Sequence, residues 1–561
     1  MSMLPNSLLS QTRTASAHKA LIFAGFGVDL FPLVEPAADL TSDDDEAKPA
    51  GLSSHHRGHG QTKALLPVAG KKMVDWVLER VEEAGIYDIL VLTPQSISKP
   101  LAHHLRARRS QPSSSSGNGT PSAKVELEEI PEEVAQRGTV RALMWAAEKG
   151  LVTTDFVVLP CDLLLSPSNL HAPSISLASL LDRHRLDDNL MTTLFSERAA
   201  GNVVEPKKDG PTEILTIYDQ KSGALLDVRE MDEFDDDEVP LRTSMLPKFP
   251  SPTLTTSLLP TQLYIFSSLL LPILRSPDHS RRLKHMENLR ELAGWLSRLS
   301  WRKNGRDALG ALGHASRATK EDGLAMGRSS TQRPAGQARN FNQPRRDAYE
   351  APSLPQTGAN TPALVSRASW RPDLGASGGY GAAASVRADP AAFGLGGAAG
   401  GKKMSAAQAR AGAGGCKVVV WRQSDGFAAR GNTVAGWVEI NRAALRLLPP
   451  SPPPTNTPSG VFISPDSFLH PSVFGNMGEK VAVKRCIVGK GCHIGKGSKL
   501  ANCVIMDSVV VGENVKLDNC VLSNGVQVRD RAALKDCELG RDVIVDADSQ
   551  LKGEQLVVEV D

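Results

Sequence analysis

Residues 486–551 read CIVGKGCHIGKGSKLANCVIMDSVVVGENVKLDNCVLSNGVQVRDRAALKDCELGRDVIVDADSQL, and this stretch decides the fold of the C-terminal region. Large aliphatic residues recur in it at intervals of six, six and five, so each position returns after 17 residues. They are Val488, Ile494, Leu500, Ile505, Val511, Leu517, Leu522, Val528, Leu534, Leu539, Val545 and Leu551. A short fixed period of this kind indicates a solenoid, in which each repeat stacks on its neighbours.

A second column of mostly small residues lies two positions before the large ones. Its members are Cys486, Cys492, Ser498, Cys503, Val509, Val515, Cys520, Val526, Ala532, Cys537, Val543 and Ser549. Residues two apart on a strand share a face, so both columns are expected to point inward. Six residues per side and three sides per coil predict a left-handed parallel β-helix over residues 477–561. Gly489, Gly495, Gly512 and Gly540 follow large inward residues, and we expect the chain to turn tightly there.

Composition and cysteine usage narrow the class of protein. Lys+Arg 64 nearly balance Asp+Glu 62, which gives no general indication of nucleic acid or an anionic membrane as partner. No apolar run is long enough to span a membrane, and residues 1–20 do not resemble a secretory signal. The seven cysteines include no CxxC pair, which argues against disulfides or a zinc site. We therefore expect a cytosolic protein whose repeat cysteines act as small buried hydrophobes.

Residues 17–303 are predicted to form an α/β domain with a Rossmann-like mixed, mostly parallel sheet. Short apolar runs predict strands at 20–25, 88–93, 155–160 and 262–266. Amphipathic patterns predict helices at 73–83, 139–148 and 176–184. Strands that alternate with helices favour a sheet covered on both faces. Polar insertions at 39–60, 110–122 and 232–238 are expected to be solvated loops.

The middle of the chain has a different composition. Residues 304–415 are rich in Gly, Ala, Ser and Arg without a sustained period, which predicts a disordered basic insertion. A weak contact of this insertion with RNA or an acidic partner is the alternative. Residues 416–448 are predicted to add a strand and a helix to the first domain, with Val434, Val438 and Ala444–Leu445 on the buried face of the helix. Residues 449–476 are Pro-rich and are predicted to be a stiff spacer.

The first predicted strand leads into a loop that carries glycine. Gly25-Phe26-Gly27-Val28-Asp29 follows the strand, and Lys63-Ala64-Leu65-Leu66-Pro67-Val68-Ala69-Gly70-Lys71 follows the first insertion. Such a loop before a helix presents backbone N–H groups to phosphates. Together with Arg137-Gly138-Thr139 and Pro160-Cys161-Asp162, these segments resemble the sugar-nucleotide pyrophosphorylase family over residues 19–299. The resemblance implies that Lys63 contacts a phosphate and that Asp162 helps to hold Mg²⁺.

The chain departs from that family at the loop, where the family reads Gly-Gly-x-Gly-Thr-Arg. Ala24 stands at the first Gly position, and Val28-Asp29 replace Thr-Arg. A carboxylate about 4 Å from a phosphate oxygen is unfavourable by roughly 1–4 kcal/mol. Losing a positioned cationic stabiliser costs on the order of a hundred-fold in rate. We therefore predict no catalytic residue and no nucleotidyl transfer.

What survives is a predicted remnant of a nucleotide pocket, made of Gly25, Gly27, Asp29, Lys63 and Asp162. The alternative for its last two members is a solvated Lys63 and an Asp162 that caps a turn. No metal site is expected, because a second carboxylate for Mg²⁺ cannot be placed from the sequence.

His493 precedes an inward residue of the repeat. A solvated, outward-facing histidine is favoured over a catalytic acyltransferase histidine.

A degenerate pyrophosphorylase-like domain followed by a hexapeptide β-helix resembles the large gamma and epsilon subunits of translation initiation factor 2B. That complex is the guanine-nucleotide exchange factor for initiation factor 2. Stretches at 23–33, 62–86, 159–164 and 417–442 are similar to the gamma type. The epsilon type carries a further C-terminal helical domain, for which about ten residues after Leu551 leave no room.

The resemblance implies a non-catalytic regulatory and structural subunit that promotes exchange of GDP for GTP. Its implied partners are the epsilon subunit, then the beta, delta and alpha subunits, with initiation factor 2 as client. No cofactor, membrane or direct nucleic-acid partner is implied. Two alternatives stay open. One is an active pyrophosphorylase of the mannose-1-phosphate guanylyltransferase type, and the other is a subunit that weakly binds GTP or a nucleotide sugar without chemistry.

Overall fold

The computed structural model describes residues 18–34, 62–110, 123–166, 175–198, 213–234, 239, 241, 245–302, 415–447 and 458–558. The predicted insertions at 39–60 and 304–415 lie outside the described residues except for Gly415, and so does 110–122 except for Ser110. The same holds for most of the acidic run at 232–238, of which the start belongs to a short 3-10 helix, Met231–Glu233. None of the described helices is both long and apolar enough to cross a membrane.

A seven-stranded mixed sheet forms the centre of the first domain, in the order β13-β8-β12-β6-β1-β4-β5. Its strands are β1 (Lys19–Phe23), β4 (Asp88–Pro94), β5 (Lys124–Ile130), β6 (Phe156–Pro160), β8 (Met191–Glu197), β12 (Leu258–Phe266) and β13 (Cys416–Trp421). β12 runs antiparallel to both neighbours, and all other pairs are parallel. β13 therefore joins this sheet at the edge beside β8, although it follows the long insertion.

Alternate residues of each strand pack into two hydrophobic cores, one on each face of the sheet. In β1, Leu21 packs in one buried cluster while Ala20 and Ile22 pack in the other. The first cluster is covered by α4 (Thr139–Glu148), α6 (Leu270–Arg275), α7 (Pro277–Leu283) and α8 (Leu289–Trp301). The second is covered by α1 (Met73–Glu83), α2 (Ser98–Ser110) and α5 (Leu177–Leu186). The expectation of a sheet covered on both faces is confirmed.

Smaller elements complete the first domain. They are α3 (Glu132–Gln136), the sheet of β9 (Ile214–Asp219), β10 (Leu225–Glu230) and β11 (Pro252–Thr255), and the pairs β2 (Pro67–Val68) with β3 (Lys71–Lys72) and β7 (Leu163–Leu165) with β14 (Ala428–Arg430). The last helix, α11, spans Val434–Leu447. Its buried face is made of Val434, Trp437, Ile440, Asn441, Ala443 and Ala444. Val438 and Leu445 are half-buried and pack against the same buried cluster as Val434 and Ala444, so the predicted face is confirmed.

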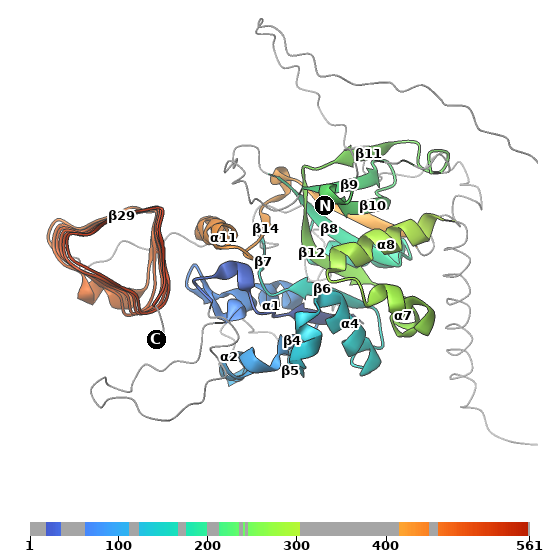
Figure 1. Ribbon diagram of the computed structural model, residues 1–561, viewed down its shortest axis with the longest axis horizontal. Coiled ribbons are helices and arrows are strands. Elements are labelled where there is room, and N and C mark those ends of the chain that lie inside the picture. The colour runs from blue at the N-terminus through green and yellow to red at the C-terminus, as the bar shows by residue number, and fades with distance from the viewer. Residues whose placement is uncertain are drawn as a thin grey trace, which may run out of the picture. The chain divides into compact units, whose positions relative to one another are not determined.

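The C-terminal region is a three-sided prism of parallel strands (Figure 1), which confirms the predicted left-handed β-helix of hexapeptide repeats. The first side is β15 (Phe462–Ile463), β17 (Ala482–Lys484), β20 (Lys499–Ala501), β23 (Lys516–Asp518), β26 (Ala533–Lys535) and β29 (Gln550–Lys552). The second is β16 (Phe468–Leu469), β18 (Ile487–Val488), β21 (Val504–Ile505), β24 (Val521–Leu522), β27 (Glu538–Leu539) and β30 (Gln555–Leu556). The third is β19 (His493–Ile494), β22 (Val510–Val511), β25 (Gln527–Val528) and β28 (Ile544–Val545).

Both predicted columns point into the prism. Every member is buried except Leu551 and Ser549 in the last coil, which are half-buried. One boundary was wrong: β15 and β16 lie inside residues 449–476, so the end of the predicted spacer is the first coil of the prism.

The chain turns directly after Gly489, Gly495, Gly512 and Gly540, as expected, but these glycines do not themselves have the left-handed backbone. The left-handed backbone lies one residue before each small inward residue, at positions such as Asn502, Asn519 and Asp536. Asn and Asp tolerate this conformation better than most residues. Gly489 does not have a positive φ, but a Cβ built on it would lie 2.7 Å from the backbone carbon of Met506 in the next coil. Glycine is therefore needed at such corners because successive coils approach closely.

One side of the prism is apolar on its outer surface as well. Ile487, Val504 and Val521 project outward from the second side, yet they are buried in a cluster with Trp76 and Trp437 of the first domain. Outward positions 17 residues apart thus bury apolar surface against the first domain, which favours association of the two parts.

Candidate functional site

The predicted pocket residues follow two adjacent strands of the first sheet. β1 and β6 are parallel, with Phe23 opposite Pro160, so the loops that follow them begin at the same edge. The backbone N–H of Cys161 donates to the carbonyl oxygen of Phe23 at 3.0 Å, which ties the two loops together. In α/β sheets, ligands bind at the carboxyl ends of the strands. This edge is therefore where a site is expected.

The glycine loop after β1 packs directly on Lys63. Gly27 has a φ of +79°, and a Cβ added to it would lie 2.8 Å from Cβ of Lys63. Gly25 is exposed, with no atom within 4 Å of the position of a Cβ. Asp29 lies in a single 3-10 turn, Val28–Leu30, where it is exposed and forms no ion pair with another described residue. The structure therefore joins Gly27 to Lys63 and leaves Asp29 apart from them.

Asp162 is fully buried and is held by two cations. Nζ of Lys63 lies 2.6 Å from Oδ2 of Asp162. Arg430 forms a fork on the same carboxylate, with Nε donating to Oδ1 at 3.1 Å and Nη2 to Oδ2 at 2.9 Å. Such fork-shaped pairs are among the stronger hydrogen-bonded ion pairs in proteins. Both carboxylate oxygens therefore already have a cationic partner.

The backbone of the C-terminal segment places Arg430 on this carboxylate. β14 pairs antiparallel with β7, which brings Arg430 opposite Leu163. The N–H of Gly431 donates to the carbonyl oxygen of Asp162 at 2.9 Å. The contact is therefore fixed by a strand pair as well as by side chains.

The charges of Arg430 and Lys63 control the pKa of Asp162. Burial by itself would raise the pKa of Asp162, but the charges of Arg430 and Lys63 and their hydrogen bonds hold it well below its usual range. The carboxylate in turn raises the pKa of Arg430 although that side chain is largely desolvated. Asp162 is therefore ionised at every physiological pH, and the three side chains together carry one net positive charge.

This arrangement does not fit a divalent cation. Mg²⁺ requires free carboxylate oxygens, and those of Asp162 are bound by Lys63 and Arg430. Among the residues that the structure describes, no three His, Cys, Asp or Glu side chains come together in a way that could hold a metal ion. A cationic side chain occupies the place that the family resemblance assigns to the metal.

The structure also places the single residues for which alternatives were open. Lys63 is not solvated, because its side chain is 12% exposed and ion-paired. Asp162 lies in the turn after β6, but the partners of its buried carboxylate are Lys63 and Arg430. His493 is exposed on the prism, as favoured.

The Arg137-Gly138-Thr139 segment contacts a distant part of the first domain. Thr139 Oγ1 donates to the carbonyl oxygen of Glu287 at 3.3 Å and accepts from the N–H of Leu289 at 3.2 Å. Gly138, with a φ of +93°, is in close contact with the backbone of Glu287. This loop therefore positions the start of α8.

Arg430 was missed by sequence reasoning. It lies 268 residues after Asp162, within a segment of unremarkable composition. The only available signal was that this segment follows a strand predicted to return to the first domain.

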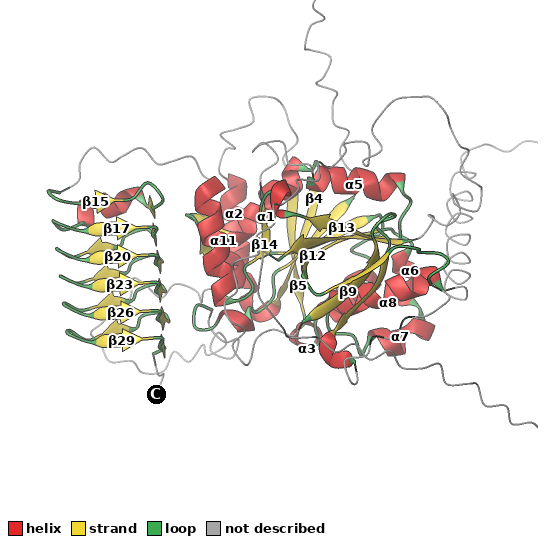
Figure 2. Cartoon of the chain, turned by 90° about the horizontal axis from the view of Figure 1, so that it is seen from above, coloured by secondary structure: helices red, strands yellow, loops and turns green. Residues whose placement is uncertain are grey.

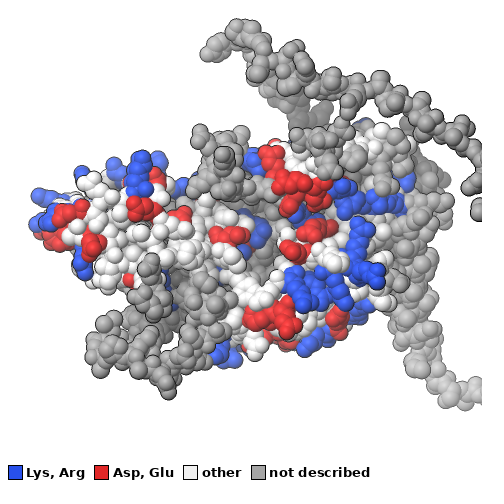
Figure 3. Space-filling model, viewed as in Figure 1, with Lys and Arg blue, Asp and Glu red and all other residues white. Residues whose placement is uncertain are grey.

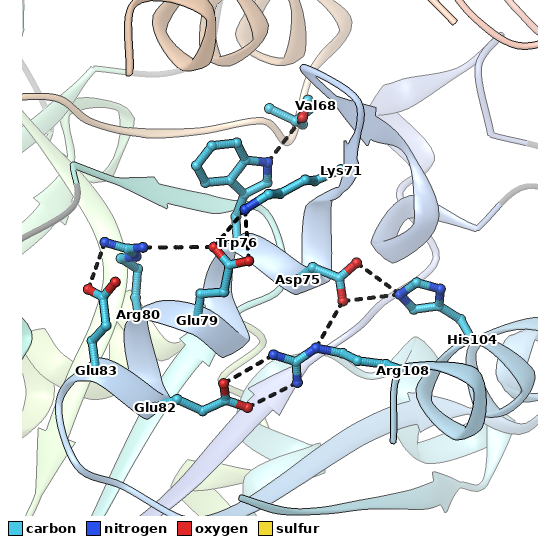
Figure 4. Close-up of polar contacts among 10 residues, drawn as sticks. All are labelled: Val68, Lys71, Asp75, Trp76, Glu79, Arg80, Glu82, Glu83, His104 and Arg108. Atoms are coloured by element: carbon cyan, nitrogen blue, oxygen red, sulfur yellow. Dashed lines mark hydrogen bonds and ion pairs between the residues drawn. The ribbon is translucent and has the colours of Figure 1, made fainter. Parts of the chain in front are cut away.

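A second polar cluster lies between α1 and α2 (Figure 4). Arg108 bonds Glu82 through both terminal nitrogens, at 3.0 and 3.1 Å, and lies 3.5 Å from Asp75. His104 contacts Asp75 at 3.0 Å, and Arg80 pairs with Glu83 at 2.7 Å. Each charged side chain drawn has an oppositely charged partner in the cluster. We interpret it as the junction that holds α2 on α1, not as a reactive site.

The fold and the matched families define the class of protein. Residues 50–211 match a family model described as MobA-like NTP transferase domain. Residues 472–555 match one described as GlmU-like, C-terminal hexapeptide. The chain thus joins an NTP-transferase-like domain to a hexapeptide β-helix.

One curated protein is similar in sequence to part of the chain. The chain is 24% identical over 261 residues to translation initiation factor eIF2B subunit gamma from Schizosaccharomyces pombe (strain 972 / ATCC 24843). The alignment covers 46% of this chain and 48% of that relative, so it spans about half the length of each.

Proposed function

We propose that this chain is a non-catalytic, regulatory and structural subunit of the guanine-nucleotide exchange complex for translation initiation factor 2. In this role it promotes exchange of GDP for GTP during translation initiation, in the cytosol. Similarity to a gamma subunit of initiation factor 2B supports the assignment. The observation that carries the non-catalytic part is the closure of Asp162 by Arg430 and Lys63.

The closure argues against nucleotidyl transfer on energetic grounds. A metal at Asp162 would have to displace a fork from a fully buried carboxylate. Breaking a buried ion pair by removing one partner costs about 3–5 kcal/mol, because a buried charge is left uncompensated. Asp29, in place of the family arginine, adds an anion where a triphosphate needs a cation. The closure of Asp162 and the presence of Asp29 both disfavour nucleotidyl transfer.

The proposed partners follow from the same resemblance. We expect an epsilon-type subunit as the direct partner, with beta, delta and alpha subunits in the wider assembly and initiation factor 2 as client. The folded domain then serves as a scaffold, and the prism offers two outer sides that the first domain does not bury. No cofactor, membrane or direct nucleic-acid contact is part of this proposal.

Affinity purification tests the assembly. The tagged full-length chain, expressed in its own cells and purified at moderate salt, is expected to bring down an epsilon-type subunit identified by mass spectrometry. A matched purification with the same tag on an unrelated cytosolic protein is the control. Recovery of the chain without that partner would overturn the proposal.

Two alternatives predict different results in solution. An active pyrophosphorylase releases pyrophosphate from GTP with mannose 1-phosphate and Mg²⁺, and the MobA-like match of residues 50–211 is the observation in its favour. A nucleotide-sensing subunit binds GTP or GDP-mannose without product, which the net positive charge at Asp162 would support. Calorimetry with both nucleotides and a pyrophosphate-release assay separate these readings from ours, which predicts no product.

A further inference from the structure

Five lysines form a basic surface on the first side of the prism. They are Lys484, Lys499, Lys516, Lys535 and Lys552, which project outward from five successive strands and are all exposed. We call this surface the lysine face. Figure 2 shows the strands that carry it stacked one above another, and Figure 3 shows Lys and Arg side chains interspersed with Asp and Glu at the outer edge of the prism. Among the outward positions of the same strands, Asp518 is the one acidic residue.

Like charges lie directly opposite each other on this face. Lys499 is the register partner of Lys516, and Lys535 is the register partner of Lys552. Neighbouring strands are about 4.8 Å apart, and like charges placed opposite each other are destabilising. No lysine of the face forms an ion pair with another described residue. Asp518, the register partner of Lys535, is the one carboxylate opposite a lysine of the face, so the repulsion is compensated only in part.

Other outward charges of the same prism are paired. Arg529 contacts Asp546 at 2.8 Å, and Arg531 contacts Asp548 at 2.6 Å, each across 17 residues of the repeat. Asn519 donates to Asp536 at 2.8 Å in the same way. The repeat thus places opposite charges in register elsewhere, so the lysine face is not a general property of the fold.

A shallow apolar hollow lies between the lysines. It measures about 310 Å³ and is lined by Ala501, Leu517, Ala533 and Leu534 together with Lys499, Lys516, Lys535 and Asp518. Two alanines in its floor leave room for the side chain or backbone of another molecule. The surface therefore combines an apolar hollow with surrounding positive charge.

We propose that the lysine face binds an acidic segment of a partner protein, with an apolar side chain of that segment seated in the hollow. Carboxylates on both sides of that side chain would neutralise the facing lysines, which is the electrostatic complementarity seen in specific interfaces. This inference does not depend on the proposed function.

A single-stranded nucleic acid fits the same surface less well. It is bound through aromatic stacking platforms together with basic residues. The aromatic residue among the outward positions is Phe462, and Nζ of Lys484 already lies 5.7 Å from its ring centre. Asp518 would repel phosphates in the middle of the face. A peptide accommodates it, because peptide side chains differ from position to position.

The test uses the full chain and a defined probe. The probe is a fluorescent 12-residue peptide of alternating Leu and Glu, compared by anisotropy with its Leu and Gln counterpart and with an oligouridine of equal charge. The variant Lys499→Glu/Lys552→Glu places a carboxylate opposite Lys516 and another opposite Lys535. It therefore removes both like-charge pairs while it neutralises the face. Lys99→Glu/Lys284→Glu, at two exposed positions of the first domain, is the matched control.

We expect the lysine-face variant to weaken binding of the acidic peptide at least about ten-fold, with binding that falls as salt rises. The control should change it less than about two-fold. The melting temperature of the lysine-face variant should not fall, which separates loss of binding from loss of fold. Equal weakening by the control, no binding of the acidic peptide by the wild type, or tighter binding of oligouridine would each overturn the proposal.

Discussion

Arg430 forms a two-pronged ion pair with Asp162, although 268 residues separate them in the chain. The pair joins a strand that follows the long insertion to a buried carboxylate at the edge of the first sheet. One contact thus links the return of the chain to the first domain with closure of the pocket. We expect this contact to affect the free energy of unfolding, the dependence of that free energy on pH, and the ability of Asp162 to bind a metal ion.

Replacing Arg430 should destabilise the first domain. In Arg430→Ala, Asp162 stays buried with only Lys63 as cationic partner, and we expect a loss of about 3 kcal/mol in the free energy of unfolding. Arg442→Ala is the matched control, because its guanidinium is exposed and contacts Asn519 at 3.0 Å. Its cost should stay below about 1 kcal/mol. Urea unfolding followed by circular dichroism measures both, and equal losses in the two variants would contradict the assigned role of Arg430.

The Asp162 carboxylate should make stability depend on pH in the acid range. Its pKa in the folded chain lies well below that of the unfolded chain, which is about 3.9. The stabilisation is therefore present above the unfolded value and is lost as pH falls below it. Asp162→Asn should lower stability by a constant amount above about pH 5, and the difference from wild type should shrink below about pH 4. A difference that does not vary with pH would show that the charge of Asp162 contributes nothing.

The buried thiols should be unreactive in the folded protein. All seven cysteines are free and buried, and burial raises the pKa of Cys161 and of Cys416 to about 12. Because the reagent must reach the sulfur and all seven side chains are buried, Ellman's reagent at pH 8 should label none of them quickly. Addition of guanidinium chloride should expose all seven. Rapid labelling of the native chain, with an unchanged circular dichroism spectrum, would contradict the described burial.

Reversing the charge of one lysine of the lysine face should relieve the repulsion between neighbouring lysines. Lys499→Glu places a carboxylate opposite Lys516, and we expect stability to rise by about 0.2–1 kcal/mol. Lys99→Glu on α2 serves as control, since Lys99 is exposed and in no ion pair with a described residue. Thermal unfolding at low and high salt measures the effect, which should diminish as salt screens the charges. A melting temperature below that of wild type would show that the lysines are not in mutual repulsion.

Local patterns predicted some elements to the residue. The bounds of α1 and α4 agree with the predicted helices at 73–83 and 139–148, because amphipathic periodicity is a property of consecutive residues. The role of Gly489 was not predictable in the same way, since it depends on how closely Met506 of the next coil approaches. Of the five residues of the predicted pocket, the structure joins Gly27, Lys63 and Asp162 and leaves Asp29 exposed.

The sequence by itself determined the prism, because its inward columns repeat every 17 residues and the strands of each coil pair with those of the adjacent coils. It also indicated that a transferase-like loop had lost its cation at Asp29. Only the tertiary structure decided that Asp162 is closed by Arg430, since that contact requires β14 to pair with β7 after a separation of more than two hundred residues. Periodicity is local and can be read along a chain, whereas an ion pair between distant segments depends on the topology that brings them together.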